Sequence, residues 1–460
     1  MKILHYALGF PPYRSGGLTK FSMDLMQQQV KEGHIVGMLW PGEIRLLSHQ
    51  VRIKQHEDYN KIKSFEVINP TPVSYDEGIQ RFTCFINEGD EKVYKEFFET
   101  YLPDVIHIHT FMGLHKNFIK VAKELKIRIV FSAHDFFPIC PKVILFNEGD
   151  VCKSIKDCSK CPECNRTALS IWKTVFLQTR LYRHIKNSTL IKKLRKTHRD
   201  AYLSGEKAKV TSSKIMGSRE DYLELRNYYK SLLDYVDTIH YNSALTKSVY
   251  ERYLGVHTSV VIPITHGNIK DNRKEKKFLP EKLRISYLGP YGEAKGFLVL
   301  KEALDEMWKY RQDFYLNVFF KMMDKPDYIQ DHGRYTYEQL EEIFENTDLL
   351  IAPSVLYETF GYTVLEALSY GVPVVVTKNV GAKDIIPDGA GVIINDICAD
   401  EVKKAIENLK IDDLVRMNHI ILDKVSIMTL PEMSEHIMEK CYKEKIMIND
   451  TDRLSNMGEM

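Results

Sequence analysis

Strong charge of one sign and long apolar runs are both missing from this sequence. It has 64 Lys and Arg residues against 62 Asp and Glu, a formal net charge of +2 at pH 7. So small a charge does not indicate a nucleic-acid partner, and any electrostatic binding must be local. No segment approaches the roughly 18 uninterrupted apolar residues that a membrane span needs. We therefore expect neither a spanning helix nor a nucleic-acid ligand.

An export signal is also missing, and cysteine is scarce. The first ten residues, MKILHYALGF, are too short and too interrupted for a signal-peptide core, and Pro11-Pro12 follows without a small-residue cleavage site. A cytoplasmic protein is expected. Its eight cysteines would then be reduced thiols or metal ligands rather than disulfides.

The chain has 460 residues, more than one hydrophobic core usually supports. Short apolar strands alternate with amphipathic helices in both halves, which predicts an α/β protein with two doubly wound, Rossmann-like domains facing a central cleft. The expected units are an N-terminal domain over 1–270, a C-terminal domain over 280–430, and a helix with a tail over 431–460. Expected strands are 2–8, 35–40, 104–109, 127–133, 283–289, 316–321, 348–353, 372–377 and 391–394; expected helices are about 19–32, 116–125, 297–310, 337–347, 361–370 and 400–409.

The segment 353–373, PSVLYETFGYTVLEALSYGVP, carries the clearest chemical pattern. A strand ends at Pro353-Ser354, a loop carries Glu358, and Gly361 opens a helix that contains Glu366. A helix start offers free N–H groups and the positive end of a dipole, which suit a phosphate or diphosphate. The two carboxylates would accept hydrogen bonds from hydroxyls of a sugar and of a ribose. The alternative, two solvated charges, is the more common explanation for an isolated pair.

Context favours the first reading, because several segments together resemble retaining family 4 glycosyltransferases of GT-B fold. The quoted segments are DLLIAPSVLYETFGYTVLEALSYGVPVVVT (348–377), YLGPYGEAKGFLVLKEAL (287–304), FPPYRSGGLTKFSMDLMQQQVKEGHIV (10–36), DVIHIH (104–109) and FSAHDFFPICP (131–141). The likeness covers most of residues 1–430 and is weakest in 41–100 and 165–225.

The resemblance implies roles for individual residues. Glu358 would bind donor-sugar hydroxyls, Lys295 would neutralise the diphosphate leaving group, and His134 would lie across the cleft near the sugar. Glu366 would hold the ribose. The remaining donor-binding residues would be Gly16 and Gly17 at the diphosphate, Gly289 in the strand–loop–helix before Lys295, Phe360 and Gly361 at the sugar, and Val364 and Leu365 at the ribose–phosphate edge.

Three positions depart from the family pattern. Pro290 occupies the place of a frequent arginine, a second cation for the diphosphate, so Lys295 or a basic residue elsewhere must do that work. Pro263-Ile264-Thr265-His266-Gly267 replaces the usual Pro-Asn-Gly, and Asp384 stands where glutamate is common.

The family's retaining reaction is generally assigned to substitution from the face that the leaving group departs from. The departing phosphate helps to deprotonate the acceptor hydroxyl, so no enzymic nucleophile is required. No catalytic cofactor or metal is required either, provided that Lys295 and the helix dipole offset the diphosphate charge.

Five cysteines fall in the loop 140–164, and two steps have CxxC spacing. They are Cys140, Cys152, Cys158, Cys161 and Cys164. Four thiolates can hold a structural zinc ion in a reducing environment. Free thiols on an ordered loop are the rival interpretation, and redox sensing is a third.

Three histidines lie on or directly after predicted strands. His134, in SAHD, follows a buried strand, where a packed or capping role competes with ligand contact. His107 and His109 share one strand face, but no nearby carboxylate or cysteine completes a metal ligand set, so we expect them to be structural.

The insertion 165–235 is helical in composition and basic. Ten Lys and Arg residues and no acidic residue lie between Arg166 and Arg199. A solvated helix face explains such a run as well as an anionic acceptor or an anionic membrane surface does. Interleaved Trp172, Phe176 and Leu181 would supply an apolar face.

The leading hypothesis is a retaining glycosyltransferase that moves a sugar from a nucleotide-sugar donor to a glycan or lipid-linked acceptor in cell-surface polysaccharide or glycoconjugate assembly. The missing arginine motivates a second, a catalytically idle GT-B protein that binds a nucleotide sugar as a scaffold. A third, an epimerase or a phosphorylase, fits the Glu358 and Glu366 segment less well.

Overall fold

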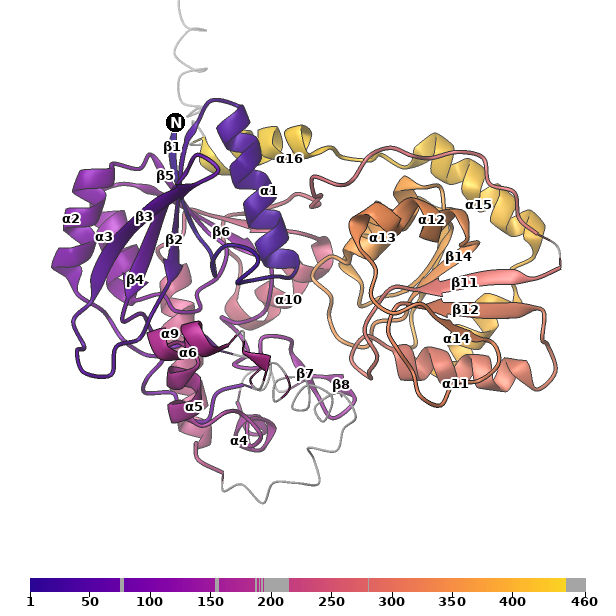
Figure 1. Cartoon of the computed structure of the whole chain (residues 1–460), viewed down its shortest axis with the longest axis horizontal. Coiled ribbons are helices and arrows are strands. Elements are labelled where there is room, and N and C mark those ends of the chain that lie inside the picture. Colours follow the sequence, from indigo (N-terminus) through magenta and orange to yellow (C-terminus); the bar gives the residue numbers. More distant parts are fainter. Residues whose placement is uncertain are drawn as a thin grey trace, which may run out of the picture.

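The computed structural model describes residues 1–74, 78–153, 157–186, 188, 189, 191, 193, 215–279 and 281–443. Most of the basic stretch after Lys186 and the tail after 443 lie outside these residues. Two α/β domains stand side by side, joined by 262–282 and by the returning C-terminal segment (Figure 1).

The N-terminal domain has an eight-stranded sheet of order β10-β9-β6-β5-β1-β2-β4-β3. Its pairs are parallel except β3 with β4, which are antiparallel. The strands are β1 (Lys2–Tyr6), β2 (Ile35–Pro41), β3 (Arg52–Tyr59), β4 (Ile62–Ile68), β5 (Val105–Ile108), β6 (Arg128–Ala133), β9 (Thr238–Tyr241) and β10 (Ser259–Val261). The main helices are α1 (Gly17–Lys31), α2 (Glu91–Tyr101), α3 (Lys116–Glu124), α9 (Arg219–Leu233) and α10 (Ala244–Leu254).

The cysteine loop and the basic insertion follow β6. They contain the hairpin β7 (Phe146–Asn147) and β8 (Asp150–Val151), and the short helices α4 (Cys161–Cys164), α5 (Ile171–Phe176) and α6 (Arg180–Ile185). The helical character expected for 165–235 is present in α5, α6 and α9, with the undescribed residues between α6 and α9.

The C-terminal domain has a six-stranded parallel sheet of order β13-β12-β11-β14-β15-β16. The strands are β11 (Leu283–Tyr287), β12 (Phe314–Val318), β13 (Ile329–Asp331), β14 (Leu349–Ala352), β15 (Val374–Thr377) and β16 (Gly391–Ile394). The helices are α11 (Phe297–Trp308), η1 (Tyr337–Gln339), α12 (Leu340–Glu345), α13 (Tyr362–Ser369), η2 (Gly381–Ile385), α14 (Ala399–Glu407) and α15 (Ile411–Lys424).

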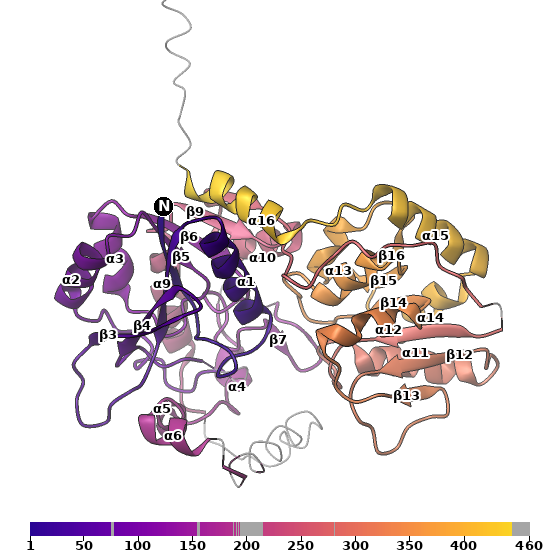
Figure 2. The same cartoon turned by 45° about the horizontal axis from the view of Figure 1, so that its top comes forward.

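The chain then returns to the N-terminal domain. After α15, the helix α16 (Leu430–Ile437) and the one-turn π-helix η3 (Met438–Tyr442) lie along the N-terminal domain beside α1 (Figure 2). Met433, Ile437 and Cys441 are buried in a cluster with Ile3 and Leu25 of the N-terminal domain. The segment predicted as a C-terminal helix therefore belongs, by its packing, to the first domain.

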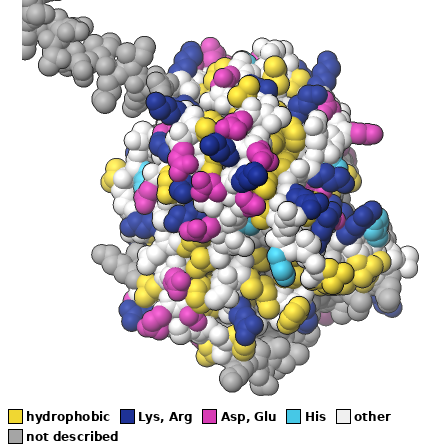
Figure 3. Space-filling view, turned by 90° about the vertical axis from the view of Figure 1, so that its left-hand side faces the viewer, with side chains coloured by type: hydrophobic (Ala, Val, Ile, Leu, Met, Phe, Trp, Pro, Cys, Tyr) yellow, Lys and Arg dark blue, Asp and Glu magenta, His cyan; other side chains and the backbone are white. Residues whose placement is uncertain are grey.

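The surface agrees with the balanced charge of the sequence. On the outer face of the N-terminal domain, basic and acidic side chains are intermingled (Figure 3). A search of the described helices finds none with the length and apolar character needed to cross a bilayer.

Candidate functional site

Loops at the carboxyl ends of both parallel sheets meet between the domains. The hydroxyl of Thr359, after β14, donates to the carbonyl of His134, after β6, at 3.1 Å. The carbonyl of Thr359 accepts from Ser243 Oγ (2.8 Å) and Thr246 Oγ1 (2.9 Å) of the loop after β9 and of α10. Carboxyl ends of parallel strands are where doubly wound proteins bind ligands, so this junction is the candidate site.

Lys295 and Glu358 are directly paired. The Lys295 Nζ lies 2.5 Å from Glu358 Oε1, and their side chains are 33% and 22% exposed. Because about a third of the Lys295 side chain is exposed, its ammonium is accessible to an anion from the cleft. The structure thus brings together two residues that are 63 positions apart in the sequence.

Gly296 holds Lys295 in place. It caps α11 in a left-handed conformation (φ +78°), and a Cβ on it would lie 1.8 Å from the Pro353 carbonyl oxygen. Only glycine permits this approach of the α11 start to the end of β14. The lysine immediately before Gly296 is therefore directed at the loop that follows Pro353.

The Glu358 loop is held by its neighbour strand. The Glu358 N–H donates to the Asn379 carbonyl at 2.8 Å, and the Gly381 N–H donates to the Glu358 carbonyl at 2.9 Å. Gly361 then caps α13 with φ +104°, a conformation that favours glycine, and the Phe360 ring is buried. The start of α13 consequently follows Glu358 closely, as predicted.

Glu366 lies on α13 and is almost fully buried. Its Oε1 is 3.1 Å from His266 Nε2, and its Oε2 is buried without a hydrogen-bond partner among the described residues. A buried carboxylate oxygen without a partner is costly, which points to a ligand hydroxyl at that position. The neighbouring Val364 and Leu365 have side chains in the core, so only their backbone can line a ribose–phosphate edge.

Gly16 and Gly17 stand opposite the start of α13. Gly16 precedes α1 with φ +113°, and a Cβ on Gly17 would come within 3.6 Å of the Tyr362 ring. The Tyr362 hydroxyl is buried without a partner among the described residues. The two helix starts, α1 and α13, therefore face one another across the junction.

His134 is partly exposed on the N-terminal side of the junction. Its Nε2 lies 3.2 Å from His109 Nδ1, and its ring packs on Phe21 with centroids 4.5 Å apart. Burial, with a smaller contribution from His240, lowers the pKa of His134 to about 3. The ring is therefore neutral at physiological pH.

Gly289 and Pro290 form a tight loop around Tyr287. The Tyr287 hydroxyl donates to the carbonyls of Pro290 (2.9 Å) and Lys295 (3.3 Å), and a Cβ on Gly289 would overlap that hydroxyl. Gly289 is thus required by packing, and the exposed Pro290 brings no cation to the site.

The five loop cysteines lie near one another without forming a closed ligand set. Among the described residues, the group of three or more potential ligands whose donor atoms lie within 4.8 Å of one another consists of His5, His107 and His109, and no cysteine belongs to it. Hydrogen bonding with Cys161 lowers the pKa of Cys158 to about 7, whereas burial raises that of Cys140 to about 12. The zinc site stays a prediction.

Several residues of this junction had no clear signal in the sequence. His266 was recognised only as a departure from a family pattern, yet it pairs with Glu366. Asp384 accepts from the Ala244 N–H at the start of α10 and so links the two domains at 2.6 Å. Ser243, Thr246 and Asn242 follow a short strand that the pattern of apolar residues did not identify.

Residues 323–421, which include Glu358, Glu366 and α13, match the sequence model of the family described as Glycosyl transferases group 1. This part of the chain is similar to a glycosyl transferases group 1 domain. The group 1 match covers β14, α13 and β15, the elements that position the two glutamates.

Relatives are distant and mostly partial. A Klebsiella pneumoniae "uncharacterized 42.6 kDa protein in cps region" is 21% identical over 398 residues, which cover 80% of this chain and 83% of that protein. A second such protein of 41.2 kDa is 26% identical over 29% of this chain and 38% of its own length. The Arabidopsis thaliana sulfoquinovosyl transferase SQD2 is 31% identical over 24% of this chain and 22% of its own length.

Solved structures show the fold. An α,α-trehalose-phosphate synthase from Burkholderia xenovorans superposes with a TM-score of 0.55 at 11% identity, over 96% of this chain and 99% of its own. HepE from Anabaena, solved with UDP and glucose, gives 0.54 at 14% identity over 95% and 98%. The fold is that of the GT-B glycosyltransferases, with two Rossmann-like domains, as predicted from the sequence.

Proposed function

We propose that this chain is a retaining glycosyltransferase that transfers a sugar from a nucleotide-sugar donor to a glycan or lipid-linked acceptor. The pairing of Lys295 with Glu358 beside the start of α13 carries the proposal, because it sets a cation, a carboxylate and a helix dipole at one point. A relative encoded in a cps region supports a role in cell-surface polysaccharide or glycoconjugate assembly.

Each group has a part in the proposed reaction. Lys295 and the N–H groups at the start of α13 stabilise charge on the diphosphate as it departs. Glu358 accepts hydrogen bonds from donor-sugar hydroxyls, and the unpartnered oxygen of Glu366 accepts one from the ribose. The departing phosphate takes the proton of the acceptor hydroxyl. No catalytic cofactor or metal enters this scheme, and a zinc ion on four of the five loop cysteines would be structural.

Nucleotide release tests this function. Wild-type protein incubated with UDP-glucose, GDP-mannose and ADP-glucose is expected to hydrolyse one of them slowly, because water can replace the acceptor. Glu358→Ala should remove that activity, whereas Glu302→Ala, an α11 substitution outside the junction, should leave it unchanged. Binding of a nucleotide sugar without any turnover, with or without acceptor lipids, would instead favour a scaffold.

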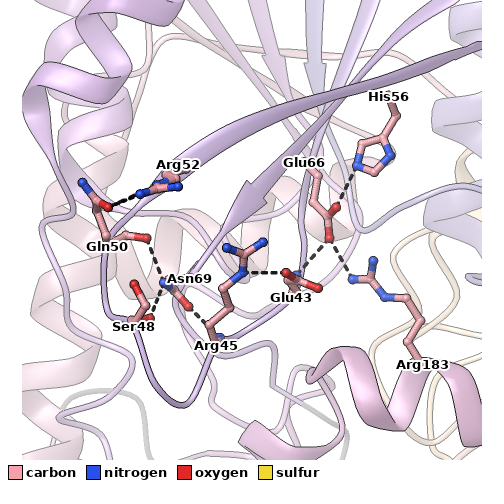
Figure 4. Close-up of polar contacts among 9 residues, drawn as sticks. All are labelled: Glu43, Arg45, Ser48, Gln50, Arg52, His56, Glu66, Asn69 and Arg183. Atoms are coloured by element: carbon pink, nitrogen blue, oxygen red, sulfur yellow. Dashed lines mark hydrogen bonds and ion pairs between the residues drawn. The ribbon is translucent and has the colours of Figure 1, made fainter.

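Contact with an anionic membrane surface is part of the proposal. The insertion exposes Trp172 (77%) and Leu181 (62%) beside Lys173 and Arg180. The Arg183 guanidinium ties α6 to Glu66 of β4, and Lys186 Nζ lies 3.2 Å from the centre of the Tyr13 ring (Figure 4 shows the Glu66 contacts). An apolar and basic surface fixed to the acceptor-side domain fits a peripheral enzyme at the inner membrane face.

Vesicle binding tests this contact. The protein is expected to sediment with vesicles of phosphatidylglycerol and phosphatidylcholine and not with phosphatidylcholine alone. Trp172→Ser should weaken sedimentation several-fold, because a large apolar group leaves the interface. The control Leu102→Ser removes another exposed apolar side chain (65%) outside the insertion and should have no effect. Equal loss in both variants would contradict the proposed surface.

A further inference from the structure

Five histidines line one face of the N-terminal sheet beneath the cleft. They occupy alternate positions on four adjacent strands and at their ends: His5 on β1, His107 and His109 on and after β5, His134 after β6, and His240 on β9. All except His134 are fully buried. Alternate residues of a strand share a face, so the rings form one cluster under α1 and η3.

Hydrogen bonds account for this cluster better than a metal does. His5, His107 and His109 have ring nitrogens close enough for a shared ion. However, both nitrogens of each of these rings already have a hydrogen-bond partner, at 2.7 to 3.2 Å. Burial lowers the pKa of all five rings, so each is neutral and carries one proton.

The assignment of donors and acceptors begins at His240, whose partner is a backbone carbonyl. The Ile262 carbonyl can only accept, so His240 Nε2, at 2.8 Å, carries the proton and its Nδ1 is bare. The Ser132 hydroxyl must then donate to His240 Nδ1 (2.7 Å) and accept from His107 Nε2 (2.7 Å). His107 Nδ1 is bare in turn and accepts from the Tyr442 hydroxyl at 2.7 Å.

Donors and acceptors can be assigned in the same way from Tyr442 to the cleft. The Tyr442 oxygen, having donated its hydrogen, accepts from Gln29 Nε2 at 3.1 Å, which turns Gln29 Oε1 towards His5. His5 Nε2 donates to that oxygen at 2.8 Å, and His5 Nδ1 accepts from His109 Nε2 at 2.9 Å. His109 Nδ1 is therefore bare and accepts from His134 Nε2 at 3.2 Å.

This series of hydrogen bonds ends at the cleft, on a ring nitrogen of His134 that can accept a hydrogen bond. His134 Nδ1 carries no proton, and its contact with Asn242 Nδ2 is 3.5 Å long, longer than every other bond in the series. Asn242 Oδ1 is also buried and unpartnered within the described part of the chain. Two acceptor atoms at one place call for a ligand that donates hydrogen bonds.

We propose that this series of hydrogen bonds, in which every ring donates through Nε2, fixes His134 as the Nε2–H tautomer. Tyr442 and Gln29 are positioning residues, because they determine which atom donates in each bond. His134 then offers only an acceptor to the cleft. This rests on the proposed function for the ligand itself: the group that His134 meets is a hydroxyl of the sugar or acceptor, and never a carbonyl or carboxylate oxygen.

Nitrogen NMR tests the chain without any substrate. In the full-length protein with 15N-labelled histidine at pH 7, long-range proton–nitrogen spectra should show all five rings neutral with the proton on Nε2. Each signal is assigned by its loss in the corresponding His→Gln variant. A proton on His134 Nδ1 would overturn the proposal.

Tyr442→Phe tests the positioning role. Without the hydroxyl, Gln29 is free to turn, and His134 should show both tautomers. Gln29→Met, which removes the acceptor of His5, should do the same. Tyr229→Phe is the matched control, since it removes a buried hydroxyl that donates to the Phe85 carbonyl and makes no hydrogen bond to the five histidines among the described residues. Wild-type histidine spectra in Tyr442→Phe and Gln29→Met would overturn the role of both residues.

Kinetics separates this role from a structural one. With the nucleotide sugar of the panel that the wild type hydrolyses, Tyr442→Phe should lower kcat by about tenfold with little change in KM, because a misoriented group costs rate. An unchanged kcat, alongside loss of activity in Glu358→Ala, would show that the chain has no part in the reaction. Persistent activity in Glu358→Ala would instead count against the proposed function. The NMR spectra would still show whether the hydrogen bonds fix the tautomer of His134.

Discussion

The two glutamates of the junction, Glu358 and Glu366, have different partners for their carboxylates. Glu358 is paired with a partly exposed lysine, whereas Glu366 is buried against one histidine, and its second oxygen has no partner among the described residues. An incoming anion can compete with Glu358 for the lysine, and the second oxygen of Glu366 can accept a hydrogen bond from a ligand. Two glutamates separated by seven intervening residues would therefore bind different parts of one ligand.

Lys295→Ala should abolish most of the activity. Pro290 supplies no charge, so in the proposed reaction Lys295 and the helix dipole would stabilise the leaving diphosphate, and we expect kcat to fall by about a hundredfold or more. Initial rates of nucleotide release measure this. Lys301→Ala, on the same helix and paired with Asp305 at 2.6 Å, is the control. Near-normal turnover in Lys295→Ala would mean that the diphosphate binds elsewhere.

His266→Phe should weaken nucleotide binding. Phenylalanine keeps the ring beside Tyr337 and Tyr362 but removes the hydrogen bond that orients Glu366. A hydrogen bond to a charged group contributes about 1.5–3 kcal/mol, so the Kd of the preferred nucleoside diphosphate should rise about tenfold or more. Calorimetric titration with UDP, GDP and ADP checks this, with the exposed His419→Phe as control. Unchanged affinity would show that His266 does not support the ribose site.

At the level of elements, local signals predicted the site-bearing segments well. The turn from β14 through Glu358 to α13 follows from Pro353, Gly361 and Gly371, whose backbone preferences act within a few residues. The β3–β4 hairpin, β9 and β13 gave weaker patterns, because short strands with mixed exposure lack a clean alternation. Why Gly289 is needed was not readable either, since the Tyr287 hydroxyl that it accommodates is placed by packing.

The attachment of α6 to the sheet can be tested through Glu66. This buried carboxylate accepts from the Glu43 N–H (3.0 Å), His56 Nε2 (2.8 Å) and Arg183 Nη2 (2.8 Å) (Figure 4). Burial alone would raise the pKa of Glu66, but Arg183 and His56 outweigh it and hold the pKa below 4.5. Its ionised form therefore stabilises the fold above the ordinary carboxyl pKa, and this contribution is lost as the pH falls through the lowered value.

Glu66→Gln should accordingly destabilise the protein by about 1–3 kcal/mol at pH 7, because buried donors lose a charged acceptor. The difference from wild type should shrink below pH 4.5, as the wild-type carboxyl becomes protonated. Urea unfolding at a series of pH values measures it. Glu57→Gln, on the exposed face of β3, should behave as wild type. A constant difference at all pH values would mean that the charge of Glu66 is not what holds α6.

At the level of the whole molecule, the buried histidines make stability depend on pH. Burial lowers the pKa of His5 and His240 to about 4 and of His134 to about 3, below the ordinary 6.5. The unfolded chain binds protons below pH 6.5 and the folded protein does not. Stability is thus fully present above 6.5 and falls as the pH drops, by up to about 1.4 kcal/mol per pH unit for each such ring.

The free energy of unfolding in urea should therefore decrease steeply between pH 7 and pH 5.5. His240→Gln should give a shallower slope, because one proton-binding group of the unfolded chain is gone, while the exposed His49→Gln should not. Equal slopes in all three proteins would show that the buried rings are already protonated in the fold.

Contacts between distant segments were the part of the molecule that the sequence could not predict. His107 and His109 were expected to be structural because no partner stood nearby in the chain, and the third ring of their cluster comes from β1. Likewise, nothing local indicated that a helix predicted after 430 would pack against the first domain. The histidine contacts depend on the order of strands in one sheet, and the helix contact depends on how the two domains are joined. Local periodicity encodes neither.

The hydrogen bond between Gln29 and Tyr442 joins residues 413 positions apart. During synthesis, the first domain emerges from the ribosome long before Tyr442 does. Until Tyr442 arrives, the donor Gln29 Nε2 and the acceptor His107 Nδ1 lack this partner. Final ordering of the first domain is then tied to the arrival of the returning segment. A chain that stops short of Tyr442 would leave uncovered the part of the first domain on which the returning segment packs.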